Sequence, residues 1–328
     1  MWRYREWLPL DPGEEPVSLG EGMTPLVRVP RIEAALEVDT VYVKDEGTNP
    51  TGSFKARGLS AAVTRATRAG AQAFTIPTAG NAGVALSAYG QRAGCAVRVY
   101  APATTPQTIL DQIQVFGADL HLIDGHIGDC GKLAKAYAAE SGATDVSTLR
   151  EPYRIEGKKT LGLELAEQLG WHLPDCIFYP TGGGTGLIGM WKAFDELRDA
   201  GWITDPSPRL FSVQSTGCAP VVRAFEANER ATTPWENPET VASGLRVPNP
   251  LGGKVMLRAL RETGGQALAV SDAELKAAAT ELARHEGIDA SPEGGATLAA
   301  LRTLVERGVV RRDHSVVLFN TGAGWLYR

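Results

Sequence analysis

Apolar and polar positions follow two patterns along this chain: short apolar runs rich in β-branched residues alternate with longer segments of helical spacing. The first half predicts four strands, at 41–44, 73–76, 96–100 and 120–123. Each strand is followed by a segment that we expect to contain a helix, at 52–68, 81–93, 106–116 and 128–141. Repeated strand and helix units are typical of parallel sheets. We therefore expect one unit of four parallel strands here.

The second half continues the pattern after Ser147. Its predicted strands lie at 176–179, 210–213 and 315–319. Its predicted helices lie at 157–169, 186–199, 255–262, 271–286 and 292–307. Residues 228–250 are rich in Pro, Thr and Asn, which predicts a loop. The fold class that we predict is α/β, with two doubly wound parallel-sheet domains.

Charge and composition narrow the choice of partners. The 328 residues include 33 basic and 38 acidic side chains, a formal charge of −5. This balance argues against nucleic acid or an anionic membrane surface as a partner. The chain has no uncharged apolar stretch of about 18 residues, so we expect a cytoplasmic protein. The four cysteines are scattered without a C-x-x-C pair, and we predict no metal site.

Lys55 is the first candidate for chemistry, because a turn at 49–54 delivers it into the first turn of a predicted helix. A cation at a helix N-terminus opposes the helix dipole. The neutral amine is then favoured, as an imine-forming lysine requires. The alternative from spacing alone is an ordinary surface lysine.

A glycine-rich segment at 180–186 follows the predicted strand 176–179 and opens a helix. Bare glycine backbone allows N–H groups to approach a phosphate, and the helix dipole adds to the attraction. Gly184, Gly186 and Gly189 also match the G-x-G-x-x-G pattern of dinucleotide sites. The next strand, however, leads into Gln214 rather than an acid that would hold a ribose hydroxyl. A monophosphate therefore fits better than NAD or ATP.

Two further turns carry polar side chains after predicted strands. Asn81, in the turn 77–82, can donate to a phenolate-like oxygen or cap its own helix. The N–H groups of the same turn can hold a carboxylate. Thr321, after the strand 315–319, offers a hydroxyl to a neutral ring nitrogen, although alone it is an ordinary turn residue.

Taken in order, these four segments resemble the fold-type II pyridoxal-phosphate enzymes. The sequences of residues 44–57 and 152–160 are similar to those of the threonine synthase family in particular. The resemblance runs from about residue 18 to the C-terminus. It implies a large cofactor-binding domain made of residues 1–57 and 151–328, and a small mobile domain of residues 58–150. It also implies a small amino acid as substrate and a homodimer.

The resemblance assigns roles to individual residues. Lys55 would hold pyridoxal 5′-phosphate through an imine and move protons, Asn81 would bond its 3′-oxygen, and Thr321 would face its ring nitrogen. The 5′-phosphate site would be formed by Gly182, Gly183, Gly184, Thr185 and Gly186. The substrate would be bound by Thr78, Ala79, Gly80, Arg154 and Lys159. A ring nitrogen that faces a hydroxyl favours elimination and addition over transamination.

The implied reaction converts O-phospho-L-homoserine and water to L-threonine and phosphate. Ala79, Ala82, Leu149 and Glu151 depart from the family pattern in the substrate region, and an acid at 151 would repel a phosphorylated substrate. The main alternative is therefore an ammonia-lyase that acts on threonine, serine or a 3-hydroxy amino acid. A dinucleotide-dependent oxidoreductase and a non-catalytic binding protein are alternatives from other classes.

Overall fold

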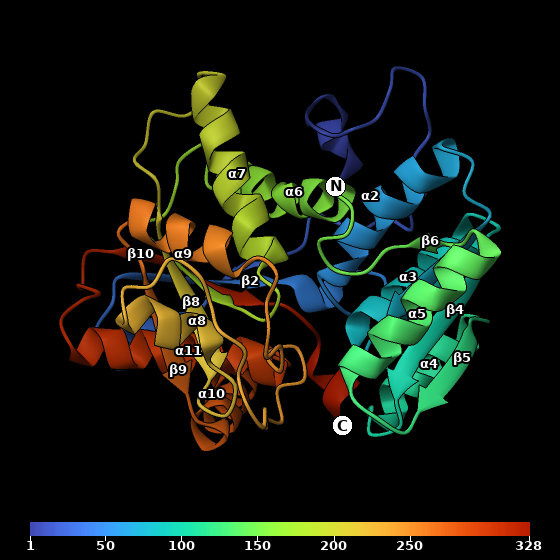
Figure 1. Ribbon diagram of the computed structural model, residues 1–328. Helices are drawn as coiled ribbons and strands as arrows, with labels where there is room; N and C mark the ends of the chain where they lie inside the picture. Colours follow the sequence, from blue (N-terminus) through green and yellow to red (C-terminus); the bar gives the residue numbers. More distant parts are fainter.

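The computed structural model describes residues 1–328 and contains two sheets, each with its own helices (Figure 1). The larger sheet has six strands, in the order β1 (Leu26–Arg28), β2 (Thr40–Asp45), β10 (Ser315–Asn320), β7 (Cys176–Pro180), β8 (Arg209–Ser215) and β9 (Gln266–Val270). Only β1 is antiparallel to its neighbour, and the other pairs are parallel. The predicted α/β class is confirmed, with one antiparallel edge strand that was not predicted.

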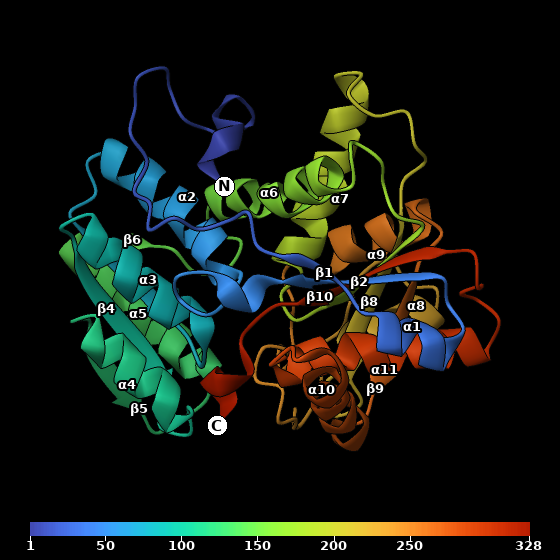
Figure 2. The same ribbon diagram turned by 180° about the vertical axis from the view of Figure 1, so that it is seen from behind.

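Helices cover both faces of the larger sheet, as Figure 2 shows from behind. One face carries α1 (Pro30–Leu36), α10 (Asp272–Glu286) and α11 (Pro292–Glu306). The other carries α6 (Tyr153–Gln168), α7 (Thr185–Asp199), α8 (Pro220–Glu226) and α9 (Gly253–Glu262). A central strand such as β7 is buried along its whole length. This double burial explains why the strand is a continuous apolar run in the sequence.

The smaller sheet has four parallel strands, in the order β5 (Asp119–Ile123), β4 (Ala96–Pro102), β3 (Ala73–Pro77) and β6 (Thr144–Asp145). One core lies between this sheet and α2 (Lys55–Arg68), α3 (Asn81–Arg92) and α4 (Gln107–Val115). The helix α5 (Ile127–Ser141) packs on the opposite face, around Tyr100.

The prediction that 41–44 joins the first four-stranded unit is wrong. This segment is β2, which lies in the larger sheet, where Val41 is paired with Val316 of β10. The fourth strand of the smaller sheet is instead β6, which has two residues. Pairing between distant parts of the chain leaves no trace in a local pattern. The strands β1 and β9 and the helices α1 and α8 were also not predicted, and α6 begins at Tyr153 rather than 157.

Three short 3₁₀ helices complete the fold: η1 (Trp2–Trp7), η2 (Glu46–Thr48) and η3 (Gly324–Tyr327). The last of these, η3, follows β10 of the larger sheet and lies beside α4 of the smaller unit, as both views show. Leu326 is fully buried in the core of the smaller unit, and Thr108 of α4 donates to the carbonyl of Arg328 at 3.0 Å. The C-terminal segment therefore ties the two units together. None of the helices has the length and apolarity needed to cross a membrane.

Candidate active site

Three neighbouring strands of the larger sheet, β2, β10 and β7, end at the same edge. The segments that follow them carry Lys55, Thr321 and the glycine loop. The N–H of Phe54 donates to the carbonyl of Thr321 at 3.1 Å, and Ser53 is paired with Gly322. The turn that carries Lys55 is thus attached directly to the turn after β10. Parallel strands bring such turns together at their carboxyl ends.

Asn81 reaches this edge from the smaller unit. A Cβ atom at Gly322 would lie 3.4 Å from the side-chain nitrogen of Asn81. The helix α3 has Gly80 as its N-cap and no side-chain cap, so Asn81 does not cap its own helix. Its Nδ2 donates to the Tyr327 hydroxyl at 3.4 Å, while its Oδ1 is buried without a partner. A buried polar atom without a partner is rare in a folded protein and fits a position that faces a ligand.

The glycine loop leads from β7 into α7, whose first residue is Thr185 and whose N-cap is Gly184 with φ 83°. The helix has no side-chain cap, so its first N–H groups are free to bind an anion. The backbone packs closely here: a side chain at Gly182 would overlap with the Gly244 carbonyl, and one at Gly186 with the Tyr179 hydroxyl. The loop therefore offers main-chain donors where no side chain fits.

Lys55 is partly buried, and its amine lies 4.1 Å from the centre of the Phe54 ring. Burial lowers the pKa of Lys55 to about 7, and the positive charge of Arg154 lowers it further while Glu293 opposes the shift. Such a pKa provides a large fraction of neutral amine near neutrality, as imine formation requires. The alternative of an ordinary surface lysine does not fit this environment.

Two further cations, Arg154 and Lys158, lie on α6 four residues apart and therefore on one face of the helix. The Lys158 amine donates to the carbonyl of Phe54 and lies 4.2 Å from the centre of the Phe54 ring. Arg154 donates from Nη1 to the carbonyl of Val146 at 2.7 Å, and its Nε has no partner. Both side chains are buried, and neither forms an ion pair. Burial, followed by the charges of Lys55 and Arg154, holds the pKa of Lys158 well below its usual range.

Lys159 is not among these groups. Its amine lies 2.8 Å from carboxylate oxygens of both Glu156 and Glu196, in an ion-pair cluster between α6 and α7. The residue that reaches the site is instead its neighbour Lys158, which the sequence analysis did not select. The signal was present, because Arg154 and Lys158 have the i, i+4 spacing of one helical face. It was missed because Lys159 was selected by its match to the basic residues of the family, and helical spacing from Arg154 was not used.

The turn before α3 uses its hydroxyl internally. The Thr78 Oγ1 accepts from the N–H groups of Gly80 at 3.1 Å and Gly83 at 3.3 Å, and donates to the Gly80 carbonyl at 3.0 Å. The side chain of Thr78 thus shapes the turn, and the N–H groups around Ala79 and Gly80 are what the turn can offer a carboxylate. Their role in substrate binding stays a prediction.

Glu151 lies at the start of α6, where its carboxylate accepts from the N–H groups of Tyr153 at 2.6 Å and Arg154 at 3.1 Å. Burial raises the pKa of Glu151, although the charge of Arg154 and these N–H groups oppose the shift. The acid that departs from the family pattern is thus occupied with the helix N-terminus. Glu151 nevertheless lies only three residues before Arg154, and the charge of Arg154 still lowers the pKa of its carboxyl group.

These groups fit a phosphorylated aromatic aldehyde such as pyridoxal 5′-phosphate. Lys55 supplies an amine that can be neutral at pH 7, and the start of α7 supplies free N–H groups for a phosphate. Asn81 has an amide oxygen without a partner and an amide nitrogen beside Tyr327. The hydroxyl of Thr321 is buried at the end of β10, and its role at the ring nitrogen stays a prediction.

One more buried group belongs to this region and was not selected from the sequence. Glu293, in the first turn of α11, is 3% exposed, and its Oε1 accepts from the N–H of Gly244 at 2.7 Å. Gly244 is also the residue whose carbonyl packs against Gly182 of the glycine loop. No motif in the sequence marks a glutamate at this position.

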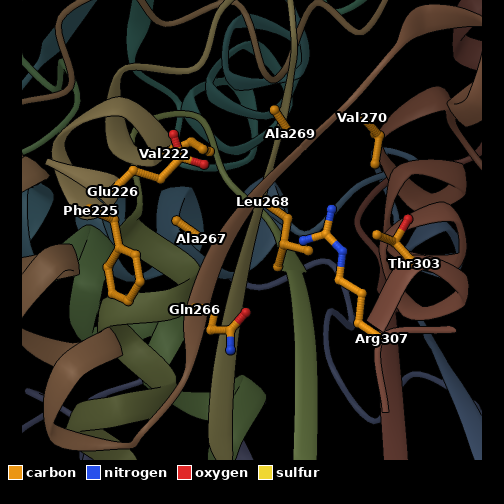
Figure 3. Close-up of a pocket in the computed structure, with 10 residues that line it drawn as sticks. All are labelled: Val222, Phe225, Glu226, Gln266, Ala267, Leu268, Ala269, Val270, Thr303 and Arg307. Atoms are coloured by element: carbon orange, nitrogen blue, oxygen red, sulfur yellow. The ribbon is translucent and has the colours of Figure 1, made fainter. Parts of the chain in front are cut away.

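A separate groove of about 420 Å³ lies along the edge strand β9, away from Lys55. Figure 3 shows Phe225 and Arg307 on opposite sides of this strand, with Leu268 between them. The groove contains no lysine and none of the residues that we assign to the cofactor or the substrate. Its lining offers no group that could form an imine, so we place the chemistry at Lys55.

Comparison with known proteins agrees with this site. The family model described as pyridoxal-phosphate dependent enzyme matches residues 17–322. A threonine synthase from Methanosarcina acetivorans is 39% identical over 98% of this chain and 79% of its own length. One from Mycobacterium tuberculosis is 35% identical over 98% of this chain and 86% of its own length.

Solved structures share the fold. Maize serine racemase covers 92% of this chain and 88% of its own, with a TM-score of 0.79 and 20% identity. The processed threonine deaminase isoform 2 of Solanum lycopersicum covers 92% of this chain and 83% of its own, with a TM-score of 0.77 and 21% identity. The fold, the family and the cofactor that the sequence predicts are thereby confirmed. The chain belongs to the family of pyridoxal-phosphate dependent enzymes.

Proposed function

We propose that this enzyme converts O-phospho-L-homoserine and water to L-threonine and phosphate. Relatives that are 34–39% identical over nearly the whole chain bear the name threonine synthase. The names of these relatives support the class of reaction. The basic side chains around Lys55 support a substrate that carries a phosphate.

The observation that carries the proposal is the pair of buried basic side chains, Arg154 and Lys158, neither of which has a carboxylate within ion-pair distance. Burial holds the pKa of Lys158 low, and an anion bound beside it would favour its charged form. A buried charge without a counter-charge is costly, so such a pair favours an anionic ligand. The phosphate of the cofactor is accounted for by the start of α7. A substrate with only an α-carboxylate would use the turn before α3. A second phosphate, on the substrate, is the anion that these two cations fit.

When bound, the cofactor supplies an electron sink that makes the substrate's Cα and Cβ protons acidic. Lys55, with a pKa of about 7, can accept these protons and return them at neutral pH. The phosphate then leaves Cγ, one proton is returned to Cγ and one to Cα, and water gives its hydroxide to Cβ and its remaining proton to the departing phosphate. The overall change is replacement of phosphate by hydroxide on the neighbouring carbon. Arg154 and Lys158 would hold the departing phosphate.

An ammonia-lyase acting on threonine or serine remains the competing proposal, because Ala79, Ala82 and Glu151 depart from the threonine synthase pattern. The deciding experiment supplies the purified holoenzyme with O-phospho-L-homoserine and, separately, with L-threonine. Release of inorganic phosphate together with L-threonine supports the synthase. Release of 2-oxobutanoate and ammonia from threonine, without phosphate release from phosphohomoserine, would replace it with the lyase.

We further propose that the enzyme is a cytoplasmic homodimer and that residues 58–150 move as a small domain relative to 1–57 and 151–328. The four cysteines are buried and unpaired, which is consistent with a reducing compartment. Light scattering measures the mass of the assembly. Hydrogen exchange with and without inorganic phosphate measures whether the small domain responds to an anion.

A further inference from the structure

Phe54, the residue before Lys55, is held at both of its backbone polar groups. Its N–H donates to the carbonyl of Thr321 at 3.1 Å, in the turn after β10. Its carbonyl accepts from the amine of Lys158, which reaches it from α6. The helix α2 has Phe54 as its N-cap residue and no side-chain cap. The start of the helix that carries Lys55 is therefore fixed by two segments that lie far from it in the sequence.

The ring of Phe54 lies against the same two amines. The Lys55 amine is 4.1 Å from the centre of this ring, and the Lys158 amine is 4.2 Å from it. The ring also packs on Tyr179 in a T-shaped arrangement, with 6.0 Å between the ring centres. The Tyr179 hydroxyl occupies the space that a side chain at Gly186 would need, at the start of α7. Phe54 thus connects the turn of Lys55 with the glycine loop.

Close packing of α2 against α6 brings Lys158 to this position. A Cβ atom at Gly58 would lie 3.0 Å from Cε and 3.1 Å from Nζ of Lys158, and 3.0 Å from the carbonyl oxygen of Arg154. On the other helix, a Cβ atom at Gly157 would overlap with the carbonyl oxygen of Arg57. The two glycines allow the helix backbones to approach. The Lys158 side chain therefore extends over the first turn of α2.

This arrangement is costly for a basic side chain. Lys158 is fully buried, and the Phe54 carbonyl is the one hydrogen-bond acceptor that its amine contacts. A buried amine with a single partner costs more free energy than an apolar side chain of similar length. Such a cost is expected at a functional site, which favours a role for Lys158 at Lys55.

We propose that Lys158 is a positioning residue that acts through Lys55: its amine holds the Phe54 peptide group, and with it the start of α2, so that the Lys55 amine meets the cofactor's aldehyde in one orientation. In this step the Lys55 nitrogen forms a double bond to the aldehyde carbon, and the aldehyde oxygen leaves as water with the two protons of the neutral amine. Holding the amine at the carbon accelerates such a step. The inference depends on an imine at Lys55 and not on the identity of the substrate.

The test is imine formation by apoenzyme mixed with pyridoxal phosphate, without substrate. Lys158→Met and Lys158→Gln both remove the amine, but only glutamine keeps an N–H donor for the Phe54 carbonyl. Lys158→Met should form the imine about tenfold more slowly than the wild type. Lys158→Gln should stay within about threefold of the wild type, with a small loss because its side chain is one atom shorter. Stopped-flow absorbance at about pH 9, above the Lys55 pKa of about 7, keeps Lys55 neutral in every variant.

Circular dichroism of the cofactor band reports how the bound cofactor is oriented. The band should be weakened in Lys158→Met and close to that of the wild type in Lys158→Gln. Lys192→Met is the matched control, because Lys192 lies on α7 and its amine pairs with Glu156 at 3.0 Å rather than with Phe54. Its rate and its band should match the wild type.

Wild-type behaviour of Lys158→Met, or equal losses in Lys158→Met and Lys158→Gln, would overturn the proposal. So would borohydride reduction that places the cofactor of the wild type on a lysine other than Lys55. If Lys158→Met does not fold, Lys158→Gln decides alone, since a loss of about tenfold in that variant contradicts a role carried by the N–H donor. Because no substrate is present, failure of the proposed threonine synthase reaction would leave all of these results unaffected.

Discussion

Lys55 and Arg57 lie two residues apart on α2 but belong to two different charged clusters. The guanidinium of Arg57 is fully buried and contacts carboxylate oxygens of Glu46 and Glu164, each at 2.6 Å. Glu164 also pairs with Lys44 at 3.2 Å. We call this set the paired cluster. Around Lys55, the cations Arg154 and Lys158 have no ion-pair partner.

The two clusters differ in function: the charges of the paired cluster stabilise the fold, whereas those around Lys55 have no ion-pair partner and could bind a ligand. In the paired cluster, the Thr24 hydroxyl donates to Glu46, while Thr160 and Gln168 accept from Arg57 and Lys44, so the buried charges have further hydrogen-bond partners. The cluster joins α2 to α6 and to the segment after β2, and therefore fixes the position of the helix that carries Lys55. Near Lys55, by contrast, Arg154 and Lys158 have no ion-pair partner, although the helix that carries Lys55 is held in place. This combination is expected of a functional site.

The largest expected effect tests this division directly. Arg57→Ala leaves Glu46 and Glu164 buried without their counter-charge, and should lower the free energy of unfolding by about 3–5 kcal/mol. Lys55→Ala removes an amine that is costly to bury when charged, and should change the stability of the apoprotein by less than about 1 kcal/mol. Denaturant unfolding of the two apoproteins against wild-type apoprotein measures both. If both variants lost the same free energy of unfolding, the two clusters would not differ in their contribution to stability.

The second prediction concerns the unpaired cations. Arg154→Ala removes a charge-assisted contact with a distal phosphate, and should cost about 2–5 kcal/mol in kcat/KM with O-phospho-L-homoserine. Binding of the cofactor to Lys55 should persist, because Arg154 is not among the groups that hold the cofactor. Steady-state kinetics give the cost, and borohydride reduction followed by peptide mapping checks that Lys55 still carries the cofactor. An unaffected kcat/KM would remove Arg154 from the substrate site.

The pH dependence of cofactor uptake gives a third prediction. The free amine of Lys55 forms the imine, so uptake by apoenzyme should rise with pH up to about 7 and then level off, rather than rise toward the ordinary lysine value of 10.5. The unfolded chain binds more protons than the folded one between these two values, so Lys55 also makes the apoprotein more stable as pH rises through that window. Arg154→Ala should move the uptake midpoint to higher pH. Stopped-flow absorbance of apoenzyme mixed with pyridoxal phosphate measures the midpoint.

The smallest effect is expected at Glu151. Glu151→Asn removes a negative charge near Arg154 while keeping a side chain that can cap α6. Turnover of phosphohomoserine should improve by less than about tenfold, because burial already raises the pKa of this carboxyl and capping holds it at the helix start. A large loss of kcat/KM would mean that the acid itself takes part in substrate binding.

The residues that we propose for the cofactor site could be selected from the sequence, whereas the charged groups around them could be selected only in part. Lys55, Asn81 and the glycine loop lie at turns after strands, where each motif is a short run of neighbouring residues and is therefore visible as local sequence. Lys158 depends on the phase of α6, which shifts with the residue at which the helix begins. Glu293 depends on the contact between α11 and the loop at Gly244, which lie far apart in the chain.

The same reasoning applies to the fold. Strands with continuous apolar runs, such as β7, were found, because burial on both faces leaves a plain local pattern. The placement of β2 beside β10 could not be read from either segment, since sheet order depends on non-local pairing. The strand β6 has two residues and carries no periodicity at all.

The crowding of the glycine loop also limits how this enzyme can evolve. Positions 182 and 186 are closed to any side chain by the Gly244 carbonyl and the Tyr179 hydroxyl. At Gly183, by contrast, the nearest atom to an added Cβ is a methyl carbon of Thr148 at 3.2 Å, and a small shift of that side chain would admit it. Among the glycines 182, 183 and 186, Gly183 is therefore the position where natural substitutions can most readily be accommodated, and in the proposed phosphate site such a substitution would change cofactor affinity without displacing the surrounding backbone.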